Sequence, residues 1–168
     1  MANYKLMIPW IKRWEGGWSN DKDDSGGCTM AGVTIKTFQQ YYGKDQTCED
    51  LKHITEQQWE HIFKTGYWDK MKADDINSQQ VAELVVQMAW GSGPVTATKR
   101  IQKLLGVKQD GVIGEITLWH INKQDPRELF EKLWNMRFDW LWEIGDTGKN
   151  KKFLKGWIKR LCSMRYEK

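Results

Sequence analysis

A chain of 168 residues can bury one hydrophobic core, or two small lobes that share one. Hydrophobic residues make up 40% of it and charged residues 29%, with three prolines, which excludes a disordered or linker-rich chain. The formal net charge of +4 is modest. Its basic residues are dispersed except over 149–160, where we expect a solvated helix face or, alternatively, contact with an anionic polymer.

The first helix is predicted from apolar residues that recur at helical spacing between Tyr4 and Ile11. It should end near Glu15, because two glycines follow. The next residues are rich in Gly, Asp, Ser and Asn, which is typical of a structured loop with a short hairpin. We therefore expect the one small β or irregular element of the fold at residues 16–33.

The clearest helical pattern lies between Val81 and Ala89, where apolar residues follow i, i+3, i+4, i+7 spacing. This helix is the expected buried centre of the fold. Gly91 to Pro94 then interrupts the chain, and its proline suits the first turn of a new helix. The break predicts a boundary between a lobe of residues 1–93 and a helical lobe of residues 94–168, packed as one compact unit.

Caps and turns elsewhere also favour helices. Thr55 to Gln58 has the pattern of a capping box, Asp110-Gly111 marks a tight turn, and Asp125-Pro126 should open a long helix. The expected fold class is therefore all-α with a small β element. The eleven tryptophans suit either a core or a surface that stacks on sugar rings, and we expect core packing for most of Trp10, Trp59, Trp119, Trp134, Trp140, Trp142 and Trp157.

The three cysteines, Cys28, Cys48 and Cys162, are odd in number and have no CxxC spacing. Neither a disulfide framework nor a zinc site is indicated, so we expect reduced thiols. The three histidines lack partners at ligand spacing, so no metal and no cofactor are expected. The N-terminal residues lack the pattern of a signal peptide, and no apolar stretch has the ~20 residues that a membrane span needs.

Glu15 is the strongest candidate for chemistry. It follows an apolar helix, beside Trp14 and before a Gly-Gly pair. Apolar surroundings and the negative end of a helix dipole both disfavour an ionised carboxyl, so we expect a raised pKa. A general acid needs such a pKa to deliver a proton to a glycosidic oxygen. Glycines beside it would let a polymeric substrate approach closely.

A second carboxylate follows nine residues later, at Asp24, with Asp21 and Asp23 beside it. Paired carboxylates cleave glycosidic bonds, one protonating the leaving oxygen and the other activating water or stabilising the cationic transition state. Thr29 could position that water. Turn formation by these aspartates is the alternative, whereas an EF-hand calcium loop is disfavoured because its spacing and terminal Glu are absent.

The loop resembles the active-site signature of glycoside hydrolase family 108, a family of bacterial and phage N-acetylmuramidases with a lysozyme-like fold. The resemblance implies that Glu15, in the EGG motif, is the catalytic residue. The spacing of Glu15, Asp24 and Thr29 is also similar to that of phage-type lysozymes, with the threonine one residue closer. The residues that carry the resemblance are Trp14-Glu15-Gly16-Gly17-Trp18, Asn20-Asp21, Asp24, Gly26-Gly27, Thr29 and Gly32-Val33-Thr34.

The resemblance continues downstream, so the two halves cover nearly the whole chain. Tyr67-Trp68-Asp69 and the helix over 81–90 match the family's YW element and core helix, and 109–118 is similar to the DGxxGxxT turn of the peptidoglycan-binding region that accompanies family members. Met30, Ala31 and Trp90 depart from the usual pattern. The substrate-binding candidates, which lie at or near loops and breaks, are Trp18, Asn20, Asp21, Tyr67, Trp68 and Trp90.

The expected function is hydrolysis of peptidoglycan at the β-1,4 bond between N-acetylmuramic acid and N-acetylglucosamine, by a monomer that binds glycan strands. Without a signal peptide, the protein would be made in a bacterial or phage-infected cytoplasm and act at the cell wall after release. The alternative is a noncatalytic wall-binding or secretion-accessory protein, which the intact Glu15 disfavours. DNA binding is disfavoured because no helix clusters Arg and Asn for base recognition.

Overall fold

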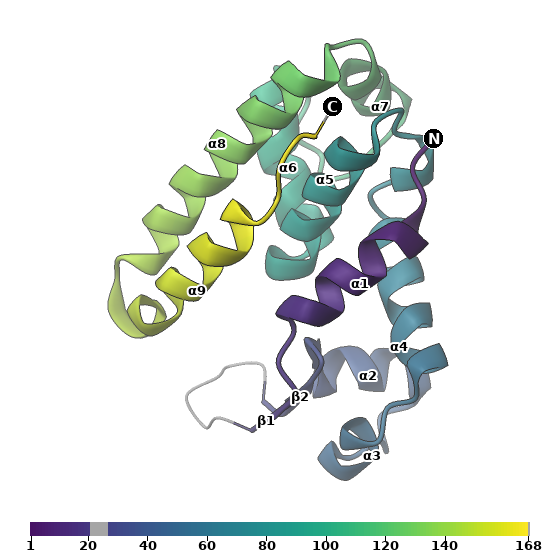
Figure 1. Cartoon of the computed structure of the whole chain (residues 1–168). Helices are drawn as coiled ribbons and strands as arrows, with labels where there is room; N and C mark the ends of the chain where they lie inside the picture. Colours follow the sequence, from purple (N-terminus) through teal and green to yellow (C-terminus); the bar gives the residue numbers. More distant parts are fainter. Residues whose placement is uncertain (21–26, 168) are drawn as a thin grey trace. The chain divides into compact units, whose positions relative to one another are not determined.

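The structure, a computed structural model, describes residues 1–20 and 27–167 and is shown in Figure 1. The chain forms two compact units. The smaller unit comprises Lys5–Gly66, and the larger one comprises Met1–Tyr4 together with Tyr67–Lys168. No helix among the described residues combines the length and apolar character that crossing a membrane requires.

The smaller unit consists of short helices around a small sheet. The first helix ends one residue before Glu15, as predicted, and the sheet spans residues 18–34, one residue beyond the expected 16–33 segment. Its elements are α1 (Tyr4–Trp14), β1 (Trp18–Ser19), β2 (Thr29–Met30), β3 (Val33–Thr34), α2 (Ile35–Tyr42), α3 (Cys48–Lys52) and α4 (Glu56–Phe63), followed by a π-helical turn, η1 (Lys64–Trp68), that runs into the larger unit.

Among the described residues, β1, β2 and β3 form one antiparallel sheet in that order. Thr29 is paired with Ser19 on one side and with Thr34 on the other. Ala31 and Gly32 connect β2 to β3 with positive φ angles of 48° and 79°, the conformation that two-residue hairpins favour. The carbonyl of Ala31 accepts a hydrogen bond from the Trp59 indole at 2.9 Å, which helps to hold this strained turn in place.

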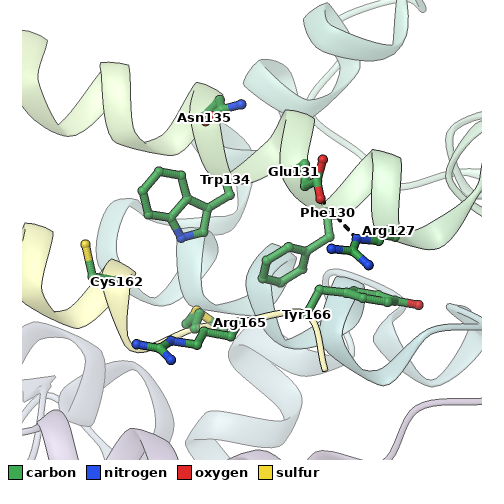
Figure 2. Close-up of a pocket in the computed structure, with 9 residues that line it drawn as sticks. Arg127, Phe130, Glu131, Trp134, Asn135, Cys162, Arg165 and Tyr166 are labelled. Carbon is green, nitrogen blue, oxygen red and sulfur yellow. Dashed lines mark hydrogen bonds and ion pairs between the residues drawn. The ribbon is translucent and has the colours of Figure 1, made fainter. Parts of the chain in front are cut away.

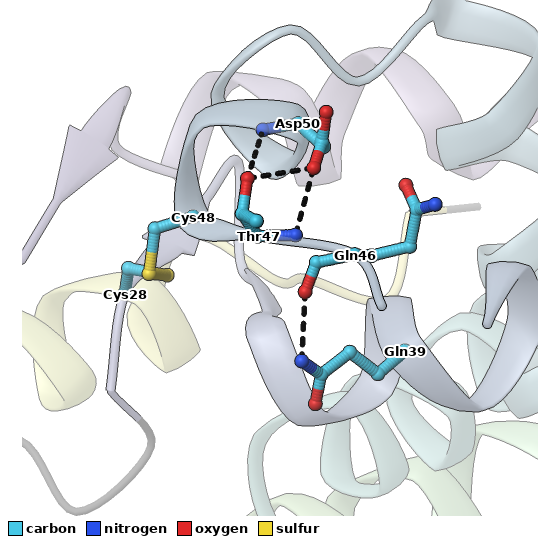
Figure 3. Close-up of a disulfide and its surroundings, with 6 residues drawn as sticks. All are labelled: Cys28, Gln39, Gln46, Thr47, Cys48 and Asp50. Carbon is cyan, nitrogen blue, oxygen red and sulfur yellow. Dashed lines mark hydrogen bonds between the residues drawn. A yellow bond between two sulfur atoms is a disulfide. The ribbon is translucent and has the colours of Figure 1, made fainter. Parts of the chain in front are cut away.

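The expectation of reduced thiols is wrong for two of the cysteines. Cys28 and Cys48 form a disulfide that joins the segment entering β2 to the first residue of α3 (Figure 3). Thr47 and Asp50 form a capping box at the same helix end, and hydrogen bonds from Thr47 lower the pKa of Asp50. The cysteines lie 20 residues apart, and only the folded chain brings their Cα atoms to 6.0 Å. Cys162 is free and exposed.

The larger unit is helical. Its central helix, α5, is buried on nearly every side, from Val81 through Ala89, as its apolar pattern predicted. The helix packs against both α6 and α8, and α8 also packs against α9 (Figure 1). The elements are the 3-10 turn η2 (Ala73–Asp75), α5 (Gln79–Ser92), α6 (Pro94–Leu105), α7 (Glu115–Asn122), α8 (Pro126–Gly145), the 3-10 turn η3 (Gly148–Asn150) and α9 (Lys151–Cys162).

The helix starts predicted at Pro94 and Asp125 are present. Pro94 opens α6 and Gly106 ends it in the left-handed conformation, while the Asp125 carboxylate caps α8 by accepting two backbone hydrogen bonds at 3.0 Å. The predicted break at 91–94 is shorter than expected, because α5 continues through Ser92.

The DGxxGxxT segment forms a turn organised by Gln102 of α6, which is 1% exposed. Its side-chain amide donates to Asp110 and Thr117, and its Oε1 accepts from the Gly111 backbone at 2.9 Å. Gly111 has a φ of +83°, and a Cβ there would come within 2.9 Å of Val95. The glycine, aspartate and threonine of this motif therefore serve the fold of the turn.

We expect that replacing Cys28 and Cys48 together by serine lowers the free energy of unfolding by about 3 kcal/mol, because the disulfide closes a loop of about 20 residues. Urea unfolding of the oxidised protein measures this loss. Cys162→Ser is the control and should change stability by less than about 0.5 kcal/mol, since that thiol is exposed. Equal stability of the double variant and the control would contradict the structural role of the disulfide.

Candidate active site

Glu15 is half-buried and lies directly after α1. Its backbone N–H donates to the Ile11 carbonyl at 2.9 Å, which extends the last helical turn and fixes where the side chain emerges. A Cβ added to Gly16 or to Gly17 would meet no described atom within 4 Å. Packing against the described residues therefore does not require these glycines, and a side chain at either position would enter open space.

The helix that carries Glu15 is anchored within the smaller unit. Met7 and Ile11, on its apolar side, are fully buried. On its polar side Lys12 forms an ion pair with Glu56 of α4, and its ammonium lies 5.3 Å from the ring centroid of Trp59. The Lys12 hydrogen bond and charge lower the pKa of Glu56. These contacts position the end of α1 against α4.

The small sheet holds three of the predicted site residues in the same unit as Glu15. Thr29 is half-buried on the central strand, opposite Ser19. Trp18 is 37% exposed on the edge strand β1, and Asn20, which follows that strand, is exposed. An edge tryptophan beside an exposed amide offers the apolar face and hydrogen-bonding group that a sugar ring requires. Asp21 and Asp24 lie outside the described residues.

The other aromatic candidates belong to the larger unit. Tyr67 and Trp90 are both half-buried, and their ring centroids are 4.6 Å apart with planes tilted by 59°. Trp68 is different, because it is 0% exposed and its indole donates to Asp74 at 2.7 Å. Its prediction as a substrate-binding residue is therefore wrong: within the structure it is a core residue with a satisfied polar atom.

Sequence reasoning missed a desolvated carboxyl group on α5. Burial raises the pKa of Glu83 above its ordinary value of 4.5, while a hydrogen bond from Gln79 acts in the opposite direction. That bond runs from the Gln79 amide nitrogen to Glu83 Oε1 at 2.7 Å. The sequence did carry a signal for this group, because Glu83 is an acidic residue within the apolar pattern of 81–89.

A groove of about 510 Å³ between α8 and the segment after α9 was also missed (Figure 2). Phe130 and Tyr166 form part of its wall, with ring centroids 5.7 Å apart. The half-buried Trp134, one of the seven tryptophans most of which we expected in the core, also lines it, and its indole donates to the Leu161 carbonyl at 3.2 Å. Arg127, with other charged side chains, adds polar groups to the aromatic wall.

Within the described ranges, 1–20 and 27–167, no three His, Cys, Asp or Glu side chains gather as they would around a metal ion.

Comparison with known protein families identifies both halves of the chain. Residues 8–93 match a family described as Glycosyl hydrolase 108, which is more than half of the chain. The chain belongs to this family. Residues 96–162 match a second family, described as Predicted Peptidoglycan domain. These matches confirm the resemblance seen in the sequence. They support a glycoside hydrolase whose substrate or binding partner is peptidoglycan.

A solved structure described as that of Brucella abortus SagA is similar, with a TM-score of 0.86 and 31% sequence identity. The likeness covers 96% of this chain and 90% of that chain. It confirms the expected mainly α, lysozyme-like fold class. No curated protein matches the chain. The two family matches lie on either side of residues 94–95, whereas the compact units divide after Gly66, so the lobe boundary at 93/94 stays a prediction.

We expect Glu83→Gln to change how stability depends on pH. Because its pKa is raised in the folded state, Glu83 stays protonated there at pH values at which the unfolded chain has lost this proton. The free energy of unfolding of wild type therefore falls as the pH rises from the unfolded pKa through the folded pKa. The amide variant keeps an acceptor for Gln79 but has no charge to desolvate. It should match wild type near pH 4 and exceed it near pH 7.

Urea unfolding at several pH values measures this difference, with Glu167→Gln, an exposed glutamate, as the control. Wild-type and Glu83→Gln stabilities that run parallel between pH 4 and pH 7 would show that the burial of this carboxyl has no energetic consequence.

Proposed function

We propose that the protein is an N-acetylmuramidase that cleaves the β-1,4 bond between N-acetylmuramic acid and N-acetylglucosamine in peptidoglycan. The observation that carries the proposal is Glu15 of the EGG motif, which follows an anchored helix and precedes two glycines with open Cβ positions, in a glycosyl hydrolase 108 chain. A half-buried carboxyl that is followed by two glycines can be approached closely by a polymeric substrate.

In the proposed reaction Glu15 protonates the glycosidic oxygen as the bond to the muramic acid breaks. Asp24 is the proposed second carboxylate, and it either stabilises the positive charge on the sugar or activates the attacking water. Thr29 would orient that water through its hydroxyl. Its place on the central strand of the sheet supports this role, because pairing on both sides limits its movement.

The proposed glycan contacts are Trp18 on β1 with Asn20 after it, Tyr67 with Trp90 in the larger unit, and Asp21, which lies outside the described residues. The exposed face of Trp18 supports stacking on a sugar ring, and the exposed Asn20 supports a hydrogen bond to a hydroxyl or acetamido group. We propose that the protein acts as a monomer without a cofactor.

The aromatic groove of Figure 2 is proposed to bind peptidoglycan without taking part in the cleavage itself. It lies mostly in the region that matches the peptidoglycan domain, on α8 and at the end of α9. Its volume of about 510 Å³ lies within the range of small-molecule sites, and its aromatic rings and charged groups suit an amphipathic sugar or peptide.

We expect Glu15→Gln to lower the rate at which purified sacculi lose turbidity by about 100-fold or more, because the amide cannot donate the proton that the leaving oxygen needs. Sacculus binding, measured by sedimentation, should persist. The matched control is Glu60→Gln, another half-buried glutamate of the smaller unit, which should retain activity. If wild type binds sacculi yet clears none, the noncatalytic wall-binding function replaces the proposal.

We expect Tyr166→Ala to weaken sacculus binding about three- to tenfold, because one aromatic contact contributes about 0.5–1.5 kcal/mol. Cleavage of short soluble glycan fragments should be unchanged, since the groove is proposed to act on the polymer. The control is Phe153→Ala, which removes an exposed aromatic ring outside the groove. Equal binding by both variants would exclude the groove as a peptidoglycan contact.

A further inference from the structure

Arg137 of α8 is a buried cation that has no carboxylate partner among residues 1–20 and 27–167. The residue is only 3% exposed to solvent. Its Nη1 donates to the neutral Ser92 hydroxyl at 3.0 Å, while its Nε is buried and has no hydrogen-bond partner in the described part of the chain. A buried charge normally requires a counter-ion, because desolvation without one is costly.

Neighbouring cations make this position more positive. Burial, and then the charges of Arg160 and Arg100, lower the pKa of Arg137 to about 10. Arg100 provides a direct comparison, because both guanidinium groups lie over the same Trp140 ring, at 4.3 Å for Arg137 and 4.5 Å for Arg100. Of these two arginines, only Arg100 has a carboxylate partner in the described structure, Glu143 at 3.1 Å.

The guanidinium of Arg137 lines a small cavity between α5, α8 and α9, which we call the arginine cavity. Its volume is about 130 Å³, and its wall includes Gln87, Gly91, Trp157 and Arg160 but no acidic side chain among the described residues. Such a volume exceeds the ~30 Å³ share of one water molecule, so it can hold a carboxylate group with water.

Two residues of α5 adapt the cavity to an anion. A Cβ at Gly91 would lie 2.8 Å from Nη2 of Arg137, so the glycine makes room for the guanidinium. Gln87 is 3% exposed, and its Oε1 is buried without a partner in the described structure. The opposite orientation of this amide, which has nearly the same shape, would turn its N–H donors toward an anion.

We propose that the arginine cavity binds one carboxylate group, held by the guanidinium of Arg137 and the side chain of Gln87. A planar guanidinium matches a carboxylate through charge-assisted hydrogen bonds, which are the strong ones, and the ligand would supply the missing counter-ion. The source is either a free small carboxylate or a carboxylate on a peptidoglycan fragment. The second source rests on the proposed function, whereas the site itself does not.

The first test follows thermal unfolding of the full-length protein in sodium acetate against sodium chloride at constant ionic strength. The melting temperature of wild type should rise saturably with acetate, since a ligand that binds the folded state stabilises it. Arg137→Met should lose this response, whereas Arg100→Met, which removes the cation already paired with Glu143, should keep it. No response by wild type, or an equal response by Arg137→Met, would overturn the proposal.

A second variant keeps the charge of Arg137. Gly91→Ala places a methyl group against the guanidinium without altering the cavity's other groups, so acetate should bind about tenfold more weakly by calorimetry. This variant covers the case in which Arg137→Met fails to fold. If Arg137→Met does not fold and Gly91→Ala binds acetate as tightly as wild type does, the proposed site is overturned.

The third measurement separates the two sources. Soluble disaccharide-peptides and their carboxyl-amidated forms are titrated into Glu15→Gln, which prevents turnover. Displacement of acetate by the acid form alone assigns the site to peptidoglycan carboxylates, and acetate binding without displacement assigns it to a free carboxylate. If wild type binds acetate at Arg137 but cleaves no sacculi, the carboxylate site stands and the muramidase proposal fails.

Discussion

The burial of α5 is the constraint on which the larger unit depends. From Val81 to Ala89 its side chains are almost entirely removed from water, and α6 and α8 pack against it. Each fully buried aliphatic side chain contributes about 1.5–3 kcal/mol to folding. Polar side chains are unfavourable on a helix that is buried on nearly every side. Glu83 and Gln87 are the two polar residues within 81–89. The raised pKa at Glu83 and the cavity at Gln87 follow from this environment.

The sequence predicted what depends on neighbouring residues. Helix caps such as Thr55 and Asp125 and the end of α1 before Glu15 follow from local hydrogen bonding or periodicity, and the structure confirms them. The β element expected at 16–33 is also present and ends one residue later, at Thr34. Contacts between distant segments could not be predicted in this way. The Cys28–Cys48 disulfide exists because α3 packs against β2, which no spacing rule reveals.

The tryptophans show the same limit. Their chemistry suits both a core and a ligand surface, so sequence alone could not divide them. Trp68, expected at the substrate, is fully buried, and its indole donates to Asp74. Trp119, one of the seven tryptophans most of which we expected in the core, is 59% exposed, and the Lys123 ammonium lies over its ring. For the candidate site, the motif predicted Glu15 and Thr29, and the structure adds their local support. The roles of Asp21 and Asp24 rest on the motif, because these residues lie outside the described ranges.

The most direct test of the account is the chemical identity of the new reducing ends in fragments released from sacculi. Digestion by wild type, followed by reduction and mass analysis, should yield fragments that end in reduced N-acetylmuramic acid, with none released by Glu15→Gln. Fragments that end in reduced N-acetylglucosamine, or equal release by Glu15→Gln, would contradict the claim that this chain is a muramidase whose general acid is Glu15.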